Sequence, residues 1–348
     1  MFFKKYRIPL IFFVSTLALK TFASVSSERF QSLYTFGINR WVIQRLSFIT
    51  GIVPFSIFEI AIYMGIFALF FYVGKSFYDS WRNRSWKILG YMFLNIAMAA
   101  ILIYSTFTLM WGLNYYRPSV AIDFNLDMKE KDKEEDLKKL YLYLIEQTNA
   151  AWVPLGGNGG NDFRRARLSF DILGDRYKFL GGRFGVAKPV VASELMNYPR
   201  ITGMYSPFTA EPNINKTIPK VAQLFTIMHE LAHQRGIAHE DEANFVAFLA
   251  CEAHPDSDFR YAGYFNVLRY VRQAIREYDS AWLDEHDYLL NIEVIDDINT
   301  LAFFWSEYDS PFEDLFKRVQ EGYLNFNSTG EYVAVVDFLV AYYREELQ

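Results

Sequence analysis

The residues best suited to chemistry are His229, Glu230 and His233, which form the pattern His-Glu-x-x-His. Residues four apart lie on the same face of an α-helix, so both imidazoles can bind one metal ion. In catalytic zinc sites an open position holds water, and the glutamate beside the first histidine can take a proton from it. The chain has only five histidines, so a chance match is rare. We predict that His229 and His233 bind Zn²⁺ and that Glu230 is the catalytic residue.

The third protein ligand has three candidates. Gly236 and His239 extend the pattern to that of metzincins, but all nine methionines precede His229, so the downstream methionine turn of that group is missing. Glu240 begins Glu-x-x-Ala-Asn, which resembles the Glu-x-x-Ala-Asp run of membrane-embedded gluzincins. A chain reversal that starts at Gly236 instead brings Glu242 level with the histidine pair. We rank Glu242 first, Glu240 second and His239 third.

The histidine pair needs a helix to position it. Thr217 is a candidate N-cap, Pro219 suits the first turn, and Gly236 is a natural stop. Between them, apolar residues at helical spacing form one stripe: Val221, Leu224, Phe225, Met228, Leu231 and Ala232.

The rest of the second half is expected to be helical around a small sheet. Extended structure is predicted over 186–215, where Thr209–Asn215 is the candidate edge strand that pairs with a peptide substrate. The predicted fold class is mainly α with a small β-sheet (α+β). Further helices are predicted over 129–149, 258–278, 292–308, 312–323 and 332–346.

Three apolar runs in the first third predict membrane spans near 8–23, 55–74 and 88–109, the first being a signal anchor or a cleaved signal peptide. The chain is 52% hydrophobic and 18% aromatic, which also favours a membrane part. Residues 1–112 contain 11 basic and three acidic residues, and the remainder contains 24 basic and 37 acidic residues. That remainder has no basic patch interleaved with aromatic residues, so we expect no nucleic-acid binding.

Basic residues flank the apolar runs on one side: Lys4, Lys5 and Arg7 at the N-terminus, and Lys75, Arg82, Arg84 and Lys87 between the second and third runs. By the positive-inside rule, both segments are cytoplasmic. The chain then leaves the membrane on the other side, with the Trp and Tyr rings of Trp111–Arg117 expected in the headgroup region. We therefore predict a multi-pass cell-membrane protein with a membrane region at 1–112 and an extracytoplasmic zincin-like domain at 113–348.

Hydrolysis at a zinc site also needs a hydrogen-bond donor for the developing oxyanion. The candidates are Tyr205, Tyr261 and Tyr264. The one cysteine, Cys251, forms no intramolecular disulfide and is expected to be a buried apolar residue.

Four stretches resemble a bacterial family classed as a domain of unknown function and grouped with the zincin-like metallopeptidases: Pro54–Ser56, Trp111–Arg117, Gly203–Glu211 and His229–Phe245. The resemblance covers nearly the whole chain and implies a membrane-anchored protein with a zincin-like domain, but no particular substrate. Together with the site residues it favours a zinc metallopeptidase that cleaves a peptide or protein outside the cytoplasm. The alternatives are a non-enzymatic membrane-anchored zinc-binding or partner-binding module, and a hydrolase of a non-peptide bond.

Overall fold

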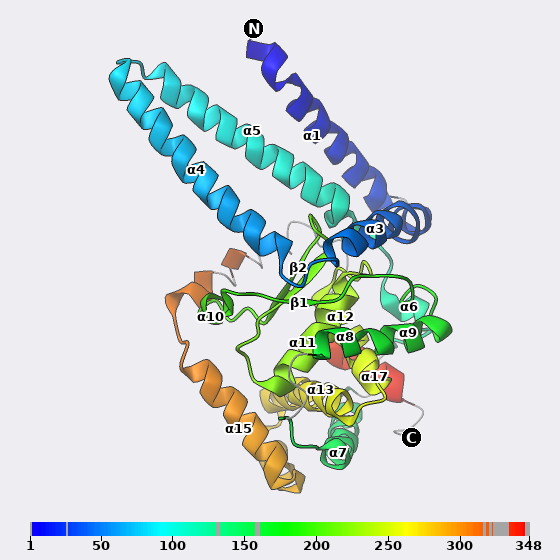
Figure 1. The fold of residues 1–348 in the computed structure, drawn as a ribbon. Coiled ribbons are helices and arrows are strands. Elements are labelled where there is room, and N and C mark those ends of the chain that lie inside the picture. The colour runs from blue at the N-terminus through cyan, green and yellow to red at the C-terminus, as the bar shows by residue number, and fades with distance from the viewer. Residues whose placement is uncertain are drawn as a thin grey trace.

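The computed structural model describes residues 2–25, 27–129, 133–156, 161–315, 318–319, 322 and 334–344. Three helices are long and apolar enough to cross a membrane, as predicted: α1 (Phe2–Val25), α4 (Ile57–Arg82) and α5 (Lys87–Met110). They project together from a mostly helical body (Figure 1). Large apolar side chains on α4, such as Phe67 and Phe70, are exposed, as expected for a helix surrounded by lipid.

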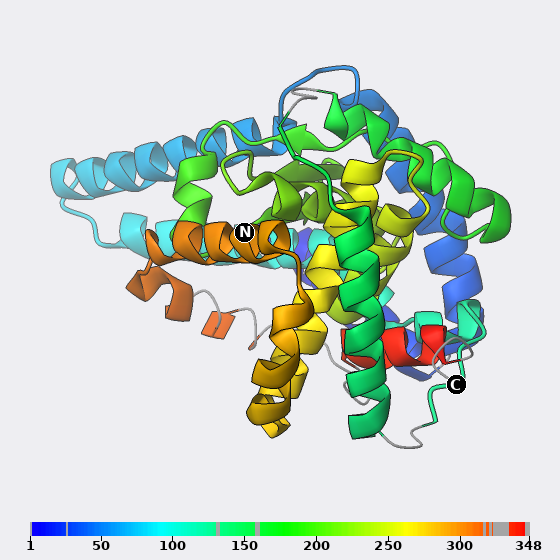
Figure 2. The ribbon, with the colours of Figure 1, turned by 90° about the horizontal axis from the view of Figure 1, so that it is seen from below.

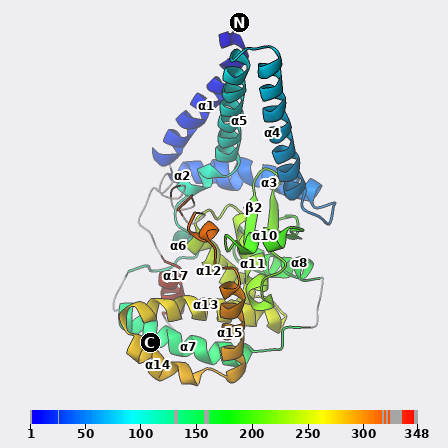
Figure 3. The same cartoon turned by 90° about the vertical axis from the view of Figure 1, so that its left-hand side faces the viewer.

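Helix α4 is longer than the apolar run that predicted it. It continues to Arg82, so most of the predicted loop between the second and third runs is helical, and 83–86 make the connection to α5. This connection and the N-terminus of the chain both lie at the end of the three helices that points away from the body (Figures 1 and 3).

The segment between α1 and α4 forms helices that the sequence patterns did not indicate. They are α2 (Ser27–Phe30), a π-helix η1 (Gln31–Asn39) and α3 (Arg40–Thr50), and they lie across the base of the three long helices (Figure 3). Arg40 donates hydrogen bonds to the carbonyls of Phe179 and Gly181, both 2.5 Å long. Residues before 113 are therefore bound closely to the body that follows them.

The sheet has three short strands, β1 (Lys188–Pro189), β2 (Gly203–Ser206) and β3 (Glu211–Ile214), in the order β1-β3-β2. β3 pairs with β1 in parallel and with β2 antiparallel. The prediction that Thr209–Asn215 is an edge for substrate pairing is wrong, because β3 uses its backbone groups on both sides. β2 lies at the edge and, like β3, packs against the helix that carries the histidine pair.

A buried ion pair joins the sheet to the start of α4. Lys188 on β1 and Glu211 on β3 are at most 2% exposed, and Lys188 Nζ lies 2.5 Å from Glu211 Oε1. Lys188 also donates to the carbonyls of Thr50 and Phe55. Glu211 accepts from two backbone N–H groups in the first turn of α4, where the helix dipole favours a negative charge. Both charges are thus satisfied by several hydrogen bonds, as burial requires.

The helices of the body pack around α13 (Ser257–Tyr278), which contacts α7 (Lys133–Ala151), α11 (Lys220–His233) and α12 (Glu240–Glu252). Figures 2 and 3 show α7 and α13 side by side. The remaining elements are α6 (Val120–Asp123), α8 (Asp162–Arg165), α9 (Arg167–Arg176), α10 (Ser193–Asn197), α14 (Ser280–His286), α15 (Ile292–Ser306), α17 (Val335–Tyr343), and the 3-10 helices η2 (Gly112–Tyr116) and η3 (Asp287–Leu289).

The helices predicted over 129–149, 258–278 and 292–308 correspond to α7, α13 and α15, with ends displaced by a few residues. The predicted helix over 332–346 contains α17, and its two ends lie outside the described residues, as does part of the one over 312–323. The mainly α class with a small sheet is confirmed.

Candidate metal site

Helix α11 begins and ends close to the predicted positions. Its first residue is Lys220, preceded by Pro219, so the predicted N-cap was wrong: Thr217 donates instead to the Asn215 side chain. Gly236 has a φ of 84°, a left-handed conformation that a residue without Cβ adopts easily. It ends the helical turn, as predicted, and lets the chain reverse into α12. The predicted apolar stripe is buried.

The two imidazoles at the end of α11 are held in the tautomer that suits a metal. Nδ1 of His229 lies 2.8 Å from Asn244 Oδ1, and Nδ1 of His233 lies 2.6 Å from the Ile237 carbonyl oxygen. Both partners are acceptors, so each Nδ1 carries the proton and donates it. Each Nε2 faces Glu240, and its lone pair is available to a metal once that nitrogen has no proton.

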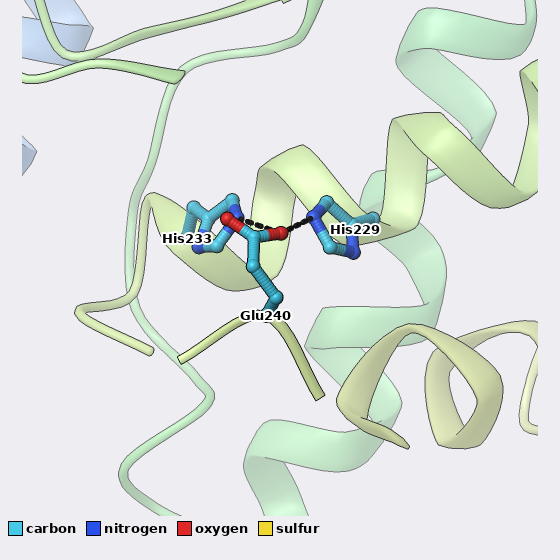
Figure 4. Close-up of side chains that lie close together, drawn as sticks. All are labelled: His229, His233 and Glu240. Atoms are coloured by element: carbon cyan, nitrogen blue, oxygen red, sulfur yellow. Dashed lines mark hydrogen bonds and ion pairs between the residues drawn. The ribbon is translucent and has the colours of Figure 1, made fainter. Parts of the chain in front are cut away.

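Glu240, the first residue of α12, brings its carboxylate between the two rings (Figure 4). Its Oε2 lies 3.1 Å from His229 Nε2 and 3.6 Å from His233 Nε2. Ligand atoms about 2.0–2.1 Å from a tetrahedral zinc lie about 3.4 Å apart, so these distances fit a shared ion. In the part of the chain that the structure describes, these three residues are the one group of His, Cys, Asp and Glu side chains placed to hold a metal.

The structure does not bring the first-ranked candidate, Glu242, to the histidine pair. Its Oε1 accepts a hydrogen bond from the backbone N–H of Val120, on the far side of α12. Glu240 and Glu242 project in different directions, since two residues turn a helix by about 200°. His239 also stays outside the group, because its Nε2 lies 3.3 Å from the Tyr115 carbonyl oxygen. The carboxylate that lies beside both histidines is that of Glu240, which the sequence ranked second.

The histidines and Glu240 shift each other's pKa strongly. Burial alone would lower the pKa of His233, but the carboxylate of Glu240 raises it to about 9. Loss of hydration opposes ionisation of Glu240, but His233 and His229 lower its pKa well below the ordinary value. The carboxylate is therefore ionised at neutral pH, as a metal ligand must be.

Glu230 lies on the same turn of α11 with its carboxylate buried. Its Oε2 has no hydrogen-bond partner among the described residues, which is unusual for a buried carboxylate. Gly203 of β2 packs directly on this side chain: a Cβ there would lie 2.7 Å from Glu230 Oε1. Burial raises the pKa of Glu230, and the neighbouring histidines oppose that shift. That oxygen is therefore free to accept a proton or a hydrogen bond.

A pocket of about 430 Å³ opens beside His229 and Glu240. Its wall includes three residues from α13 that the sequence did not single out: Asn266, Arg269 and Tyr270. The hydroxyl of Tyr270 lies 3.4 Å from Asn244 Oδ1. Burial raises the pKa of Tyr270 to about 12, so the phenol keeps its proton. No pattern along α13 distinguishes these residues, because only the packing of α13 against α11 and α12 places them here.

The three tyrosines proposed as oxyanion donors do not line this pocket. Tyr261 donates to Asp297 and Tyr264 donates to Glu252, so both hydroxyls are already used. Tyr205 is buried against the Trp111 ring, at 5.0 Å between centroids.

The segment that follows α5 packs against the site. The Trp111 ring meets the His233 ring edge-on at 5.6 Å, and the Tyr115 ring meets His239 in the same way at 5.3 Å. Both aromatic residues are at most 7% exposed. The expectation that the rings of this segment lie among lipid headgroups is therefore wrong. Trp and Tyr suit a protein core as well as a membrane interface, so composition alone did not separate the two.

A sequence family described as "Protein of unknown function (DUF3810)" matches residues 34–340. The chain belongs to this family. The matched region of this DUF3810 protein contains α4, α5 and all of the site residues. No curated protein and no solved structure is significantly similar to the chain. The family description names no activity, and it does not link the chain to the zincin-like metallopeptidases that the sequence resemblance implied.

Asn244→Ala is expected to weaken zinc binding by about 10- to 100-fold, because His229 then loses the acceptor that fixes its ring and tautomer. Competition against a chromophoric chelator measures the affinity. Asn161→Ala, an exposed change away from the site, is the matched control. Equal affinities for the two variants would contradict a role for Asn244 in orienting the ligand.

Proposed function

We propose that this DUF3810 protein is a membrane-anchored, zinc-dependent metallopeptidase with a zincin-like body of the gluzincin type. His229, His233 and Glu240 would hold the zinc. The observation that carries the proposal is the convergence of these three side chains beside the unpartnered carboxylate oxygen of Glu230. Structural zinc sites are usually closed by four protein ligands and rich in cysteine, whereas nitrogen and oxygen ligands with an open position are typical of catalytic sites.

The chain's own residues then have distinct roles in peptide hydrolysis. Bound zinc would supply a Lewis acid that activates water and polarises the substrate carbonyl. Glu230 accepts a proton from the attacking water and passes it to the leaving amine, for which a carboxyl with a raised pKa is well suited. Tyr270 is protonated and lies in the wall of the pocket, so it is the candidate donor to the developing oxyanion; it would exchange its long, 3.4 Å hydrogen bond to Asn244 for one to the substrate. Asn244 and Ile237 orient the two imidazoles.

The test is cleavage of a diverse peptide mixture by the full-length, zinc-loaded protein in detergent, read by mass spectrometry. Glu230→Gln keeps the size of the side chain but cannot accept the proton, so the rate is expected to fall by about 10²- to 10⁴-fold while zinc stays bound. Glu146→Gln, an exposed change on α7, should leave the rate unchanged. Equal cleavage by wild type and Glu230→Gln would contradict the mechanism. Stoichiometric zinc without any cleavage would favour a non-enzymatic binding module.

We also propose that the body lies outside the cytoplasm. The N-terminus and the 83–86 connection share the end of the long helices away from the body, and that end carries the basic residues Arg82, Arg84 and Lys87. A reporter that works only outside the cytoplasm is expected to be active when fused after the last residue and inactive when inserted at 83–86. The reverse pattern would place the body in the cytoplasm.

A further inference from the structure

The pocket beside the candidate metal site contains a guanidinium with no anionic partner. Arg269 is half-buried in the pocket wall, together with His229 and Glu240. Within the described residues it forms no ion pair and no side-chain hydrogen bond. Its guanidinium carbon lies 5.9 Å from the centre of the Phe265 ring. Burial lowers the pKa of Arg269, which is the expected effect of removing a cation from water without pairing it.

The neighbouring guanidinium groups are, by contrast, neutralised. Arg272, one turn further along α13, forms a bidentate ion pair with Asp287, from Nε to Oδ1 and from Nη2 to Oδ2. Arg200, the other arginine in the pocket wall, pairs with Asp309 and with Glu313, at 2.5 and 2.7 Å. Arg269 is therefore the arginine of this pocket whose five N–H donors remain available to a ligand.

A partly buried, unpaired charge is unfavourable in the protein alone, so a ligand group that pairs with it gains more there than at an exposed site. The planar guanidinium matches a carboxylate with two parallel hydrogen bonds. The pocket also has the size of a typical small-ligand site, and two of the candidate metal ligands, His229 and Glu240, line it. A substrate carboxylate paired with Arg269 would therefore lie in the same pocket as His229 and Glu240, close to the bond to be cleaved.

We propose that Arg269 binds a carboxylate of the substrate in this pocket, so that the protein acts on peptides carrying a carboxylate close to the cleaved bond. The inference rests on the proposed peptidase function. The carboxylate comes from an Asp or Glu side chain or from a free C-terminus, and both present the same group to the guanidinium. Arg269 is thus a specificity residue, separate from the groups that hold the metal or move protons.

The cleavage test makes two comparisons between peptides. The first compares peptides containing Asp or Glu with peptides that have Asn or Gln in their place, and the second compares a free with an amidated C-terminus. For the carboxylate peptides, Arg269→Gln is expected to lower kcat/KM by about 10- to 100-fold, the usual value of a charge-assisted pair, and to leave the neutral peptides unchanged. Arg269→Lys, which keeps the charge but not the planar fork, should lose less. The set that responds identifies the source of the carboxylate. Arg164→Gln, an exposed change on α8, is the control.

A binding arm separates this inference from the proposed function. Fluorescent carboxylate peptides and their neutral counterparts are titrated into the zinc-loaded Glu230→Gln protein, with and without Arg269→Gln. A preference for the carboxylate that disappears with Arg269→Gln supports the inference even if no peptide is cleaved. Cleavage without any such preference, or a preference that Arg269→Gln leaves intact, would overturn it while the peptidase proposal stands.

Discussion

Replacing Glu240 by alanine is expected to abolish stoichiometric zinc binding by the full-length protein. Glu240 Oε2 is the oxygen that lies between the Nε2 atoms of His229 and His233, so its removal leaves two protein ligands for the ion. Changes in groups that merely orient a ligand cost about 10- to 100-fold in affinity, and loss of a ligand itself should exceed that range. Elemental analysis after dialysis gives the stoichiometry, and chelator competition gives the affinity.

The neighbouring Glu242 provides the matched control. Glu242→Ala removes the acceptor for the Val120 N–H, so it should lower the stability of the body but keep the zinc. His239→Ala should also keep it, since His239 meets the Tyr115 carbonyl and not the ion site. If only Glu242→Ala loses zinc, the third ligand is Glu242, as ranked first from the sequence. If only His239→Ala loses zinc, the site is of the metzincin type.

The sequence predicted the residues of the site that lie on α11 but did not rank Glu240 above Glu242 on α12. The histidine pair and Glu230 follow from spacing within one helix, which local sequence determines. The third candidate depends on how the chain crosses from α11 to α12. Glu240 starts α12 directly after the extended His239, so it meets the end of α11 without the further turn that the ranking of Glu242 assumed. The Glu-x-x-Ala-Asn spacing carried the better signal, because Asn244 then lies one turn beyond Glu240 and reaches His229.

The fold also has parts that local sequence predicts and parts that depend on tertiary contacts. The three apolar helices and the long helices of the body follow from length and hydropathy, which are local properties. Helices α2 and α3 are too short to stand out by length and hydropathy. The contacts of Arg40 with the 178–181 carbonyls hold α3 against the body, and they join residues far apart in the sequence. The pocket residues Arg269 and Tyr270 are also placed by tertiary packing alone, because they lie about 40 residues beyond the histidine pair in the sequence.

Lys188→Met is expected to destabilise the body by about 3–5 kcal/mol, because it leaves the carboxylate of Glu211 buried without its cation. The loss should appear as a lower midpoint of thermal unfolding in detergent. Lys139→Met, which removes an exposed ion pair with Glu135 on α7, should change stability by less than about 1 kcal/mol. The double variant Lys188→Met/Glu211→Leu should recover part of the loss, since no unpaired charge remains.

The same substitution tests how firmly the membrane helices are joined to the site. Lys188 and Glu211 connect the 50–58 segment to β1 and β3, and β3 pairs with β2, whose Gly203 packs on Glu230. A destabilised Lys188→Met protein should therefore lose peptide cleavage at a lower temperature than the Lys139→Met control. Equal stability of the two variants would mean that the N–H groups at the start of α4 compensate the charge of Glu211 without Lys188, and that the ion pair does not hold the sheet to α4.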